Sequence, residues 1–140
     1  MAVEIVKYDG GFIVDPESDT KEVFVPSPPT MMTIKINPRP VVIYITGKAV
    51  DESYDKIDAL KAYCEENKVC FVCPESDDAE EVGPTYSYVM KNAKKINVKA
   101  NEMSVYCTAD AEDLAKEAVE YMVDELDAEL EEDDIEVFEI

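Results

Sequence analysis

The second half of the chain alternates short apolar runs with segments of helical periodicity. The continuous apolar run at residues 41–45 predicts a central strand buried on both faces. Residues 69–73 predict the next buried strand, and the short β-rich run at residues 103–107 predicts a third core strand. After each run, apolar residues spaced three and four apart predict helices, at residues 53–67, 85–95 and 110–130. Alternation at residues 135–140 predicts a final strand. This order predicts right-handed βαβ crossovers and an α/β fold with a mostly parallel sheet flanked by helices.

The first 39 residues follow a different pattern, in which short segments alternate apolar and polar positions. These segments predict four strands, at residues 3–8, 12–14, 21–25 and 31–36. The Asp-Gly-Gly sequence at residues 9–11 is typical of a hairpin turn, and residues 15–19 predict an exposed loop. We therefore expect one domain over residues 1–140, with antiparallel strands in residues 1–39 and a βαβ core in residues 40–140.

The last predicted helix opens directly after the strand at residues 103–107. It has one apolar face, formed by Leu114, Ala118, Val119, Met122 and Leu126. Strand, tight turn and helix form the layout of a nucleophile elbow, in which a catalytic side chain stands at the edge of a sheet. An acidic stretch at residues 77–83 predicts a loop. Because sites in parallel sheets form where the strands end, we expect functional residues in three segments, 46–50, 74–78 and 107–111.

Net charge is the most unusual bulk property. The 140 residues carry a formal charge of −20, which opposes binding to nucleic acid and to anionic membrane surfaces. A charge of this size favours solubility, and a basic protein partner is the functional alternative. The longest apolar run, residues 41–45, is far shorter than the roughly 20 residues of a membrane-spanning helix. The first residues lack the pattern of a signal peptide, so we expect a cytoplasmic protein.

Cysteine and histidine usage limits the chemistry further. The chain has four cysteines, Cys64, Cys70, Cys73 and Cys107. Cys70 and Cys73 have C-x-x-C spacing, but on a strand they point to opposite faces, so we expect buried core thiols. The sequence contains no histidine, which excludes a Ser-His-Asp or Cys-His site formed within it. Neither a cofactor nor a metal site is predicted.

Residues 40–118 resemble the N-terminal half of an α/β-hydrolase of the esterase/lipase type, in the branch similar to hormone-sensitive lipase. Residues 40–47, Pro-Val-Val-Ile-Tyr-Ile-Thr-Gly, resemble the strand that leads into the family's His-Gly-Gly-Gly loop, and residues 69–75 resemble the next strand, which often ends in Pro-Glu. Residues 95–103 resemble the linker to the elbow strand. Residues 107–115, Cys-Thr-Ala-Asp-Ala-Glu-Asp-Leu-Ala, stand where the family has Gly-Asp-Ser-Ala-Gly-Gly-Asn-Leu-Ala.

This resemblance implies a truncated α/β-hydrolase-like fold whose catalytic motifs are eroded. It implies a vestigial elbow at Cys107, Thr108, Ala109, Asp110 and Ala111. It also implies a vestigial oxyanion loop at Thr46, Gly47, Lys48 and Ala49. The nucleophilic serine falls on Ala109, and the sequence reaches Ile140 before the acid and histidine of the triad. No base accompanies Cys107, Thr108 or Asp110 as a replacement nucleophile, so we assign no catalytic residue.

Three functional hypotheses follow from these observations. The first is a non-catalytic interaction or scaffold module that forms a homo-oligomer through its C-terminal edge strand, residues 135–140. The second is a small-molecule site for an acyl or carboxylate ligand, with Lys48, Thr108 and Asp110 around the vestigial turn. The third is an esterase-type hydrolase completed by a partner subunit that supplies the histidine.

Overall fold

The main body of the protein is a six-stranded sheet in the order β1-β2-β6-β5-β7-β8. The computed structural model describes residues 3–8, 11–16, 19–46, 57–74, 78–130 and 135–138. The strands of the sheet are β1 (Val3–Tyr8), β2 (Gly11–Pro16), β6 (Cys70–Pro74), β5 (Arg39–Ile45), β7 (Val98–Cys107) and β8 (Ile135–Val137). Strand β5 pairs in parallel with β6 and β7, and β7 pairs in parallel with β8. Strands β1, β2 and β6 pair antiparallel. The predicted fold class is thereby confirmed.

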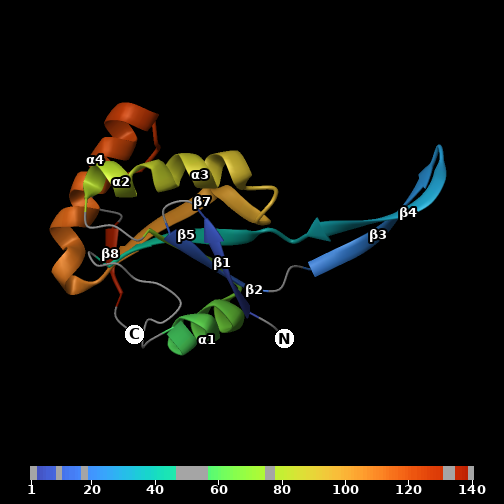
Figure 1. Cartoon of the computed structure of the whole chain (residues 1–140), viewed down its shortest axis with the longest axis horizontal. Helices are drawn as coiled ribbons and strands as arrows, with labels where there is room; N and C mark the ends of the chain where they lie inside the picture. Colours follow the sequence, from blue (N-terminus) through green and yellow to red (C-terminus); the bar gives the residue numbers. More distant parts are fainter. Residues whose placement is uncertain are drawn as a thin grey trace.

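Helices cover both faces of this sheet (Figure 1). Helix α1 (Ile57–Asn67) lies on one face. The other face carries α2 (Ala79–Val82), α3 (Pro84–Asn92) and α4 (Glu112–Leu126). Strand β5 supplies both layers, because Val42 and Tyr44 pack with Leu60 of α1, while Ile43 and Ile45 join the cluster under α4. The apolar face predicted for the last helix is confirmed, since its middle residues are buried in that cluster.

The two cysteines of the C-x-x-C sequence lie on opposite faces of β6. Cys70 packs with Val72 and Val89 on the α3 side, and Cys73 packs with Phe71 on the α1 side. All four cysteines are buried, and none of them forms a disulfide. The prediction of buried core cysteines is confirmed.

An aromatic cluster on the α1 side joins the middle of the chain to its C-terminal strand. Phe71 is its centre, with ring centroids 5.5–5.9 Å from the other members, Tyr44, Tyr63, Tyr106 and Phe138. Edge-to-face and tilted arrangements of this kind add to the gain from burial alone. The cluster therefore holds β8 to the rest of the sheet.

The N-terminal strands are antiparallel, as predicted, but only β1 and β2 join the main sheet. Strands β3 (Asp19–Pro26) and β4 (Pro29–Ile36) pair with each other in a separate two-stranded ribbon. Figure 1 shows this ribbon projecting away from the body. The loop predicted at residues 15–19 is largely wrong, because β2 runs to Pro16 and β3 begins at Asp19. The predicted turn at residues 9 and 10 lies outside the described residues.

The acidic segment at residues 77–83, predicted as a loop, contains helix α2. The Asp78 carboxylate accepts a hydrogen bond from the Glu80 N–H at 2.9 Å and caps the helix. Acidic residues in the first turn favour a helix because they face its partial positive charge. Val82 is fully buried against α4. Capping and burial thus outweigh the polar composition that suggested a loop.

Four further boundaries differ from the sequence-based expectation. Strand β7 begins at Val98 rather than at residue 103, because Val98 is buried and pairs with Arg39. The last helix ends at Leu126 rather than at residue 130, because Asp127 adopts a left-handed conformation with φ 55°. Helix α3 ends at Asn92, and β8 ends at Val137. The start predicted for the first helix, with Ser53 as its cap, lies outside the described residues.

The aromatic cluster gives a stability prediction. Replacing Phe71, which is fully buried, by Ala should lower the free energy of unfolding by about 3–5 kcal/mol, because it removes apolar contacts and leaves a cavity. The matched control is Phe24→Ala, since Phe24 is 59% exposed and its loss should change stability by about 0.5 kcal/mol or less. Urea unfolding followed by circular dichroism measures both. Equal losses for the two variants would contradict this account of the core.

Candidate functional site

The site predicted at the strand ends lies where β5 and β7 finish side by side. These strands are parallel neighbours, and Ile45 pairs with Cys107 in the last register position. The Thr108 N–H donates to the Ile45 carbonyl at 3.1 Å, so the pairing continues for one residue beyond the sheet. Thr46 and Thr108 therefore meet at the carboxyl edge of the sheet, which is where sites form in parallel α/β structures.

A short 3-10 turn separates β7 from helix α4. The turn, η1, covers Ala109–Ala111 and starts from an extended Thr108. The Thr108 hydroxyl donates to Asp110 Oδ1 at 2.6 Å and lies 3.4 Å from the Thr46 carbonyl oxygen. The Ala111 N–H donates to the Thr108 carbonyl at 3.0 Å. The side chains of Thr108 and Asp110, which the sequence places together as ligand-binding candidates, are thus in direct contact.

Burial divides the five residues of this turn into two groups. Cys107 and Ala111 are buried in the cluster beneath α4. Ala109 and Asp110 are exposed, and Thr108 is partly exposed. A ligand at this edge would therefore meet a hydroxyl, a methyl group and a carboxylate, whereas the Cys107 thiol faces the core.

The turn has no residue with a left-handed backbone. Non-glycine residues with positive φ in the described part of the chain are Asn37, Lys68, Asn97 and Asp127. Ala109 is not among them. A nucleophile elbow is a sharp, strained turn that lifts its catalytic side chain above the sheet. Here the segment passes from an extended Thr108 through the 3-10 turn to Ala111, whose φ of −111° and ψ of 12° lie between the extended and helical regions.

The remaining residues of the predicted site are only partly placed. Thr46 is buried beside Thr108. Gly47, Lys48 and Ala49 lie outside the described residues, as do residues 75–77 of the neighbouring strand end. The grouping of Lys48 with Thr108 and Asp110 therefore stays a prediction.

Phe138 closes one side of the β7 end, a contact that the sequence did not predict. Its N–H donates to the Cys107 carbonyl at 2.8 Å, and its own carbonyl accepts from the Tyr44 hydroxyl at 3.1 Å. The pKa of the adjacent Tyr106 lies above its ordinary value of 10.0, first because the phenol is buried and then because Tyr63 contributes a charge and a hydrogen bond. The neutral phenol at this position belongs to the aromatic packing. Only the alternation of residues 135–140 signalled that this segment would join the sheet.

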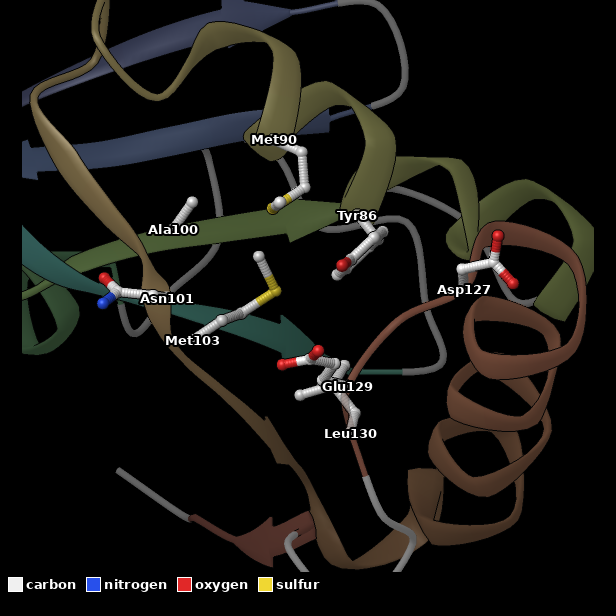
Figure 2. Close-up of a pocket in the computed structure, with 8 residues that line it drawn as sticks. All are labelled: Tyr86, Met90, Ala100, Asn101, Met103, Asp127, Glu129 and Leu130. Carbon is white, nitrogen blue, oxygen red and sulfur yellow. The ribbon is translucent and has the colours of Figure 1, made fainter.

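A cavity of about 490 Å³ lies elsewhere, between α3, the first half of β7 and the segment after α4. In Figure 2, Tyr86 and Met90 from α3 face Met103 of β7, with Glu129 and Leu130 on another side. A bulge in β7 helps to form it, because the register passes from Lys99 opposite Pro40 to Met103 opposite Val41. Ala100 and Asn101 lie in the bulge between these two register positions, and both line the cavity.

The lining of this cavity suits an apolar group with a positive charge. Two thioethers, a phenol ring and a leucine provide the apolar wall, and Asp127 and Glu129 provide carboxylates. No sequence motif marks it, since its residues come from three separate segments. Within the described ranges, no group of three or more histidine, cysteine, aspartate or glutamate residues could hold a metal ion. No described helix has the length and apolarity needed to cross a membrane.

Comparison with solved structures identifies the fold. The chain is similar to esterase LipW from Mycobacterium marinum, with 15% identity and a TM-score of 0.52 over 79% of this chain and 40% of that one. It is also similar to carboxyl esterase 2 from the mycorrhizal fungus Tuber melanosporum, with 11% identity and a TM-score of 0.53 over 78% and 42% of the two chains. A third similar structure is an arylesterase, with 12% identity and a TM-score of 0.50 over 80% and 43%.

These similarities show an α/β-hydrolase fold and confirm the fold that the sequence resemblance implied. The chain spans about two fifths of the length of the esterases that it matches. No protein-family model matches the sequence, and no curated protein matches it.

Proposed function

We propose that this chain is an α/β-hydrolase-like protein that has lost ester hydrolysis and acts as a non-catalytic interaction module. In the family resemblance Ala109 takes the position of the nucleophilic serine, and a methyl group cannot attack an ester. The observation that carries the proposal is that Ala109 opens a 3-10 turn in which no residue has positive φ, whereas a nucleophile elbow holds its catalytic residue in a strained conformation.

The neighbouring groups do not replace the missing serine. Cys107 is fully buried, so its thiol does not reach a substrate at the sheet edge. Thr108 donates its hydroxyl hydrogen to Asp110, but an exposed carboxylate is a weak base for an alcohol. A base that titrates near neutral pH is needed, and the sequence has no histidine. Supply of a histidine by a partner subunit is the competing hypothesis.

The edge of β8 is the surface through which we expect a homo-oligomer to form. β8 is the terminal strand in the sheet order, and an edge strand presents backbone groups that can pair with another chain. The Phe138 N–H donates toward β7, to the Cys107 carbonyl. Because backbone N–H and C=O groups alternate in direction along a strand, those of Val137 face away from β7. Val137 is 44% exposed. Glu136 beside it opposes pairing with a second acidic copy, so any such contact should be weak.

The loss of catalysis predicts no turnover of short p-nitrophenyl esters above the buffer rate. Ala109→Ser should not create activity, because no base is present to take the proton of the serine hydroxyl. The matched controls are Thr108→Ala and Asp110→Ala, which should leave the background rate unchanged. Hydrolysis by the unmodified protein that falls at least tenfold in Thr108→Ala would show that the turn is catalytic and would refute the proposal.

The proposed role of β8 predicts concentration-dependent self-association that needs the Val137 N–H. Val137→Pro removes this outward donor, whereas Val137→Thr keeps it at a similar side-chain volume. Size-exclusion chromatography with light scattering should show at least tenfold weaker association for the proline variant only. If both variants associate like the unmodified protein, the β8 edge is not the contact.

A further inference from the structure

The ribbon formed by β3 and β4 is a second candidate surface, at the opposite end of β5 from the turn after β7. Its two strands pair only with each other. Figure 1 shows the tip of the ribbon well away from the helices and the main sheet. An isolated two-stranded hairpin is at best marginally stable in water. A ribbon with this shape gains stability when another surface covers one of its faces.

The foot of the ribbon is held firmly to the body. Lys35 Nζ donates to the Lys95 carbonyl at 3.0 Å, and Asn97 Nδ2 donates to the Ile36 carbonyl at 3.1 Å. Asn37 Nδ2 also donates to the Asp19 carboxylate at 3.0 Å, across the two strands. These bonds fix the direction of the ribbon at its base. The arrangement presents its faces to solvent in a defined orientation.

The strand register gives the ribbon one apolar face. Directly opposed residues in an antiparallel pair share a face, and residues two apart on a strand do so as well. The pairs Lys21–Ile34, Val23–Met32 and Val25–Thr30 therefore lie on one face. We call this the apolar ribbon face; its apolar members are Val23, Val25, Met32 and Ile34.

The opposite face is polar near the base of the ribbon and apolar near its tip. It carries the polar pairs Thr20–Lys35 and Glu22–Thr33, and then the apolar pairs Phe24–Met31 and Pro26–Pro29. The ribbon holds four of the seven exposed large hydrophobic side chains found in the described residues. Met32 is 50% exposed and Ile34 is 37% exposed, so the apolar ribbon face is open to solvent.

Charge is also distributed unevenly between the ribbon and the rest of the chain. Residues 19–36 contain two acidic residues, Asp19 and Glu22, and two lysines, Lys21 and Lys35, so their net charge is zero. The remainder carries the whole formal charge of −20. Two copies that meet body to body bring like charges together, whereas two ribbons can meet without that repulsion.

We propose that the apolar ribbon face is a self-association surface, on which the ribbons of two copies stack face to face about a two-fold axis. A two-fold contact uses the same patch on both copies, and the Val23–Met32 pair stands at the centre of the patch. The projection of the ribbon keeps the acidic bodies apart. This contact is separate from the β8 edge and does not depend on the loss of catalysis.

The size of the patch sets the expected strength of the contact. Two eight-residue strands measure about 26 Å by 10 Å at ordinary strand spacings. That footprint is well below the roughly 800 Å² per partner of a stable interface. The dimer should therefore be weak and reversible, and it should strengthen with salt because screening reduces the repulsion between the bodies.

The test is sedimentation velocity from about 10 μM to 1 mM in the Val137→Pro protein, whose β8 edge lacks its outward donor, with a matched pair of further variants. Met32→Lys places a charge at the centre of the apolar ribbon face and should weaken the remaining dimerisation at least tenfold. Thr33→Lys places the same charge on the opposite face, next along the strand and facing Glu22, and should leave that dimerisation unchanged. Both variants make the net charge less negative, so a loss of association cannot come from added repulsion between bodies.

A cross-link locates the contact independently. The four natural cysteines are buried, so Met32→Cys and Thr33→Cys each introduce one accessible thiol. A bismaleimide of about 10 Å, the usual spacing of stacked sheets, should give covalent dimers with Met32→Cys and not with Thr33→Cys.

Two outcomes would overturn the proposal. They are a Val137→Pro protein that stays monomeric up to 1 mM in high salt, and equal weakening by Met32→Lys and Thr33→Lys in that protein. The first outcome, together with association of the unmodified protein, would place self-association at the β8 edge. Neither outcome bears on ester hydrolysis, so the proposed loss of catalysis is tested separately.

Discussion

Burial of β5 on both faces is the constraint on which the rest of the structure depends. Its residues from Val41 to Ile45 are at most 4% exposed, and a strand buried in this way needs hydrogen-bonding neighbours on both sides and a packed layer on each face. Strands β6 and β7 supply the hydrogen bonds. Helix α1 covers one face, and α2 to α4 cover the other. Together they bring the ends of β5 and β7 to one edge, where the turn at Thr108 lies.

Much of this core could be predicted from sequence because its signals are local. The continuous apolar run at β5 predicts a central strand, and the spacing of Ala118, Val119 and Met122 predicts the buried face of α4. The contact between Thr108 and Asp110 was also accessible, since the two residues are close in sequence and follow a predicted strand. Cys70 and Cys73 were placed on opposite faces from strand geometry alone.

Features that depend on distant or competing interactions were missed. Alternation predicted β3 and β4 as strands, but the expectation that all four N-terminal strands open the main sheet is wrong for these two, because strand partners are chosen by contacts far apart in sequence. The acidic composition around Glu80 concealed a helix stabilised by its cap and by burial of Val82. Phe138 packs on Phe71 and Tyr44 across long sequence separations, and no local pattern indicates this contact.

The fold and the turn after β7 give different information about function. The sheet order and the similar solved structures establish an α/β-hydrolase fold, while the turn retains the strand-to-helix path without a serine or a residue of positive φ. The same scaffold carries an exposed strand edge at β8 and a projecting ribbon at β3 and β4. We propose both features as surfaces for association, and neither needs a catalytic group.

The most direct test of the proposed loss of catalysis is covalent labelling with a fluorophosphonate, read by intact-mass spectrometry. Such reagents attach to hydroxyl groups that a protein activates for attack. The account predicts an unmodified mass after prolonged incubation, because the sequence offers no histidine as a base for the Thr108 hydroxyl and Ala109 carries no hydroxyl. A single adduct on Thr108, absent from the Thr108→Ala variant, would contradict it.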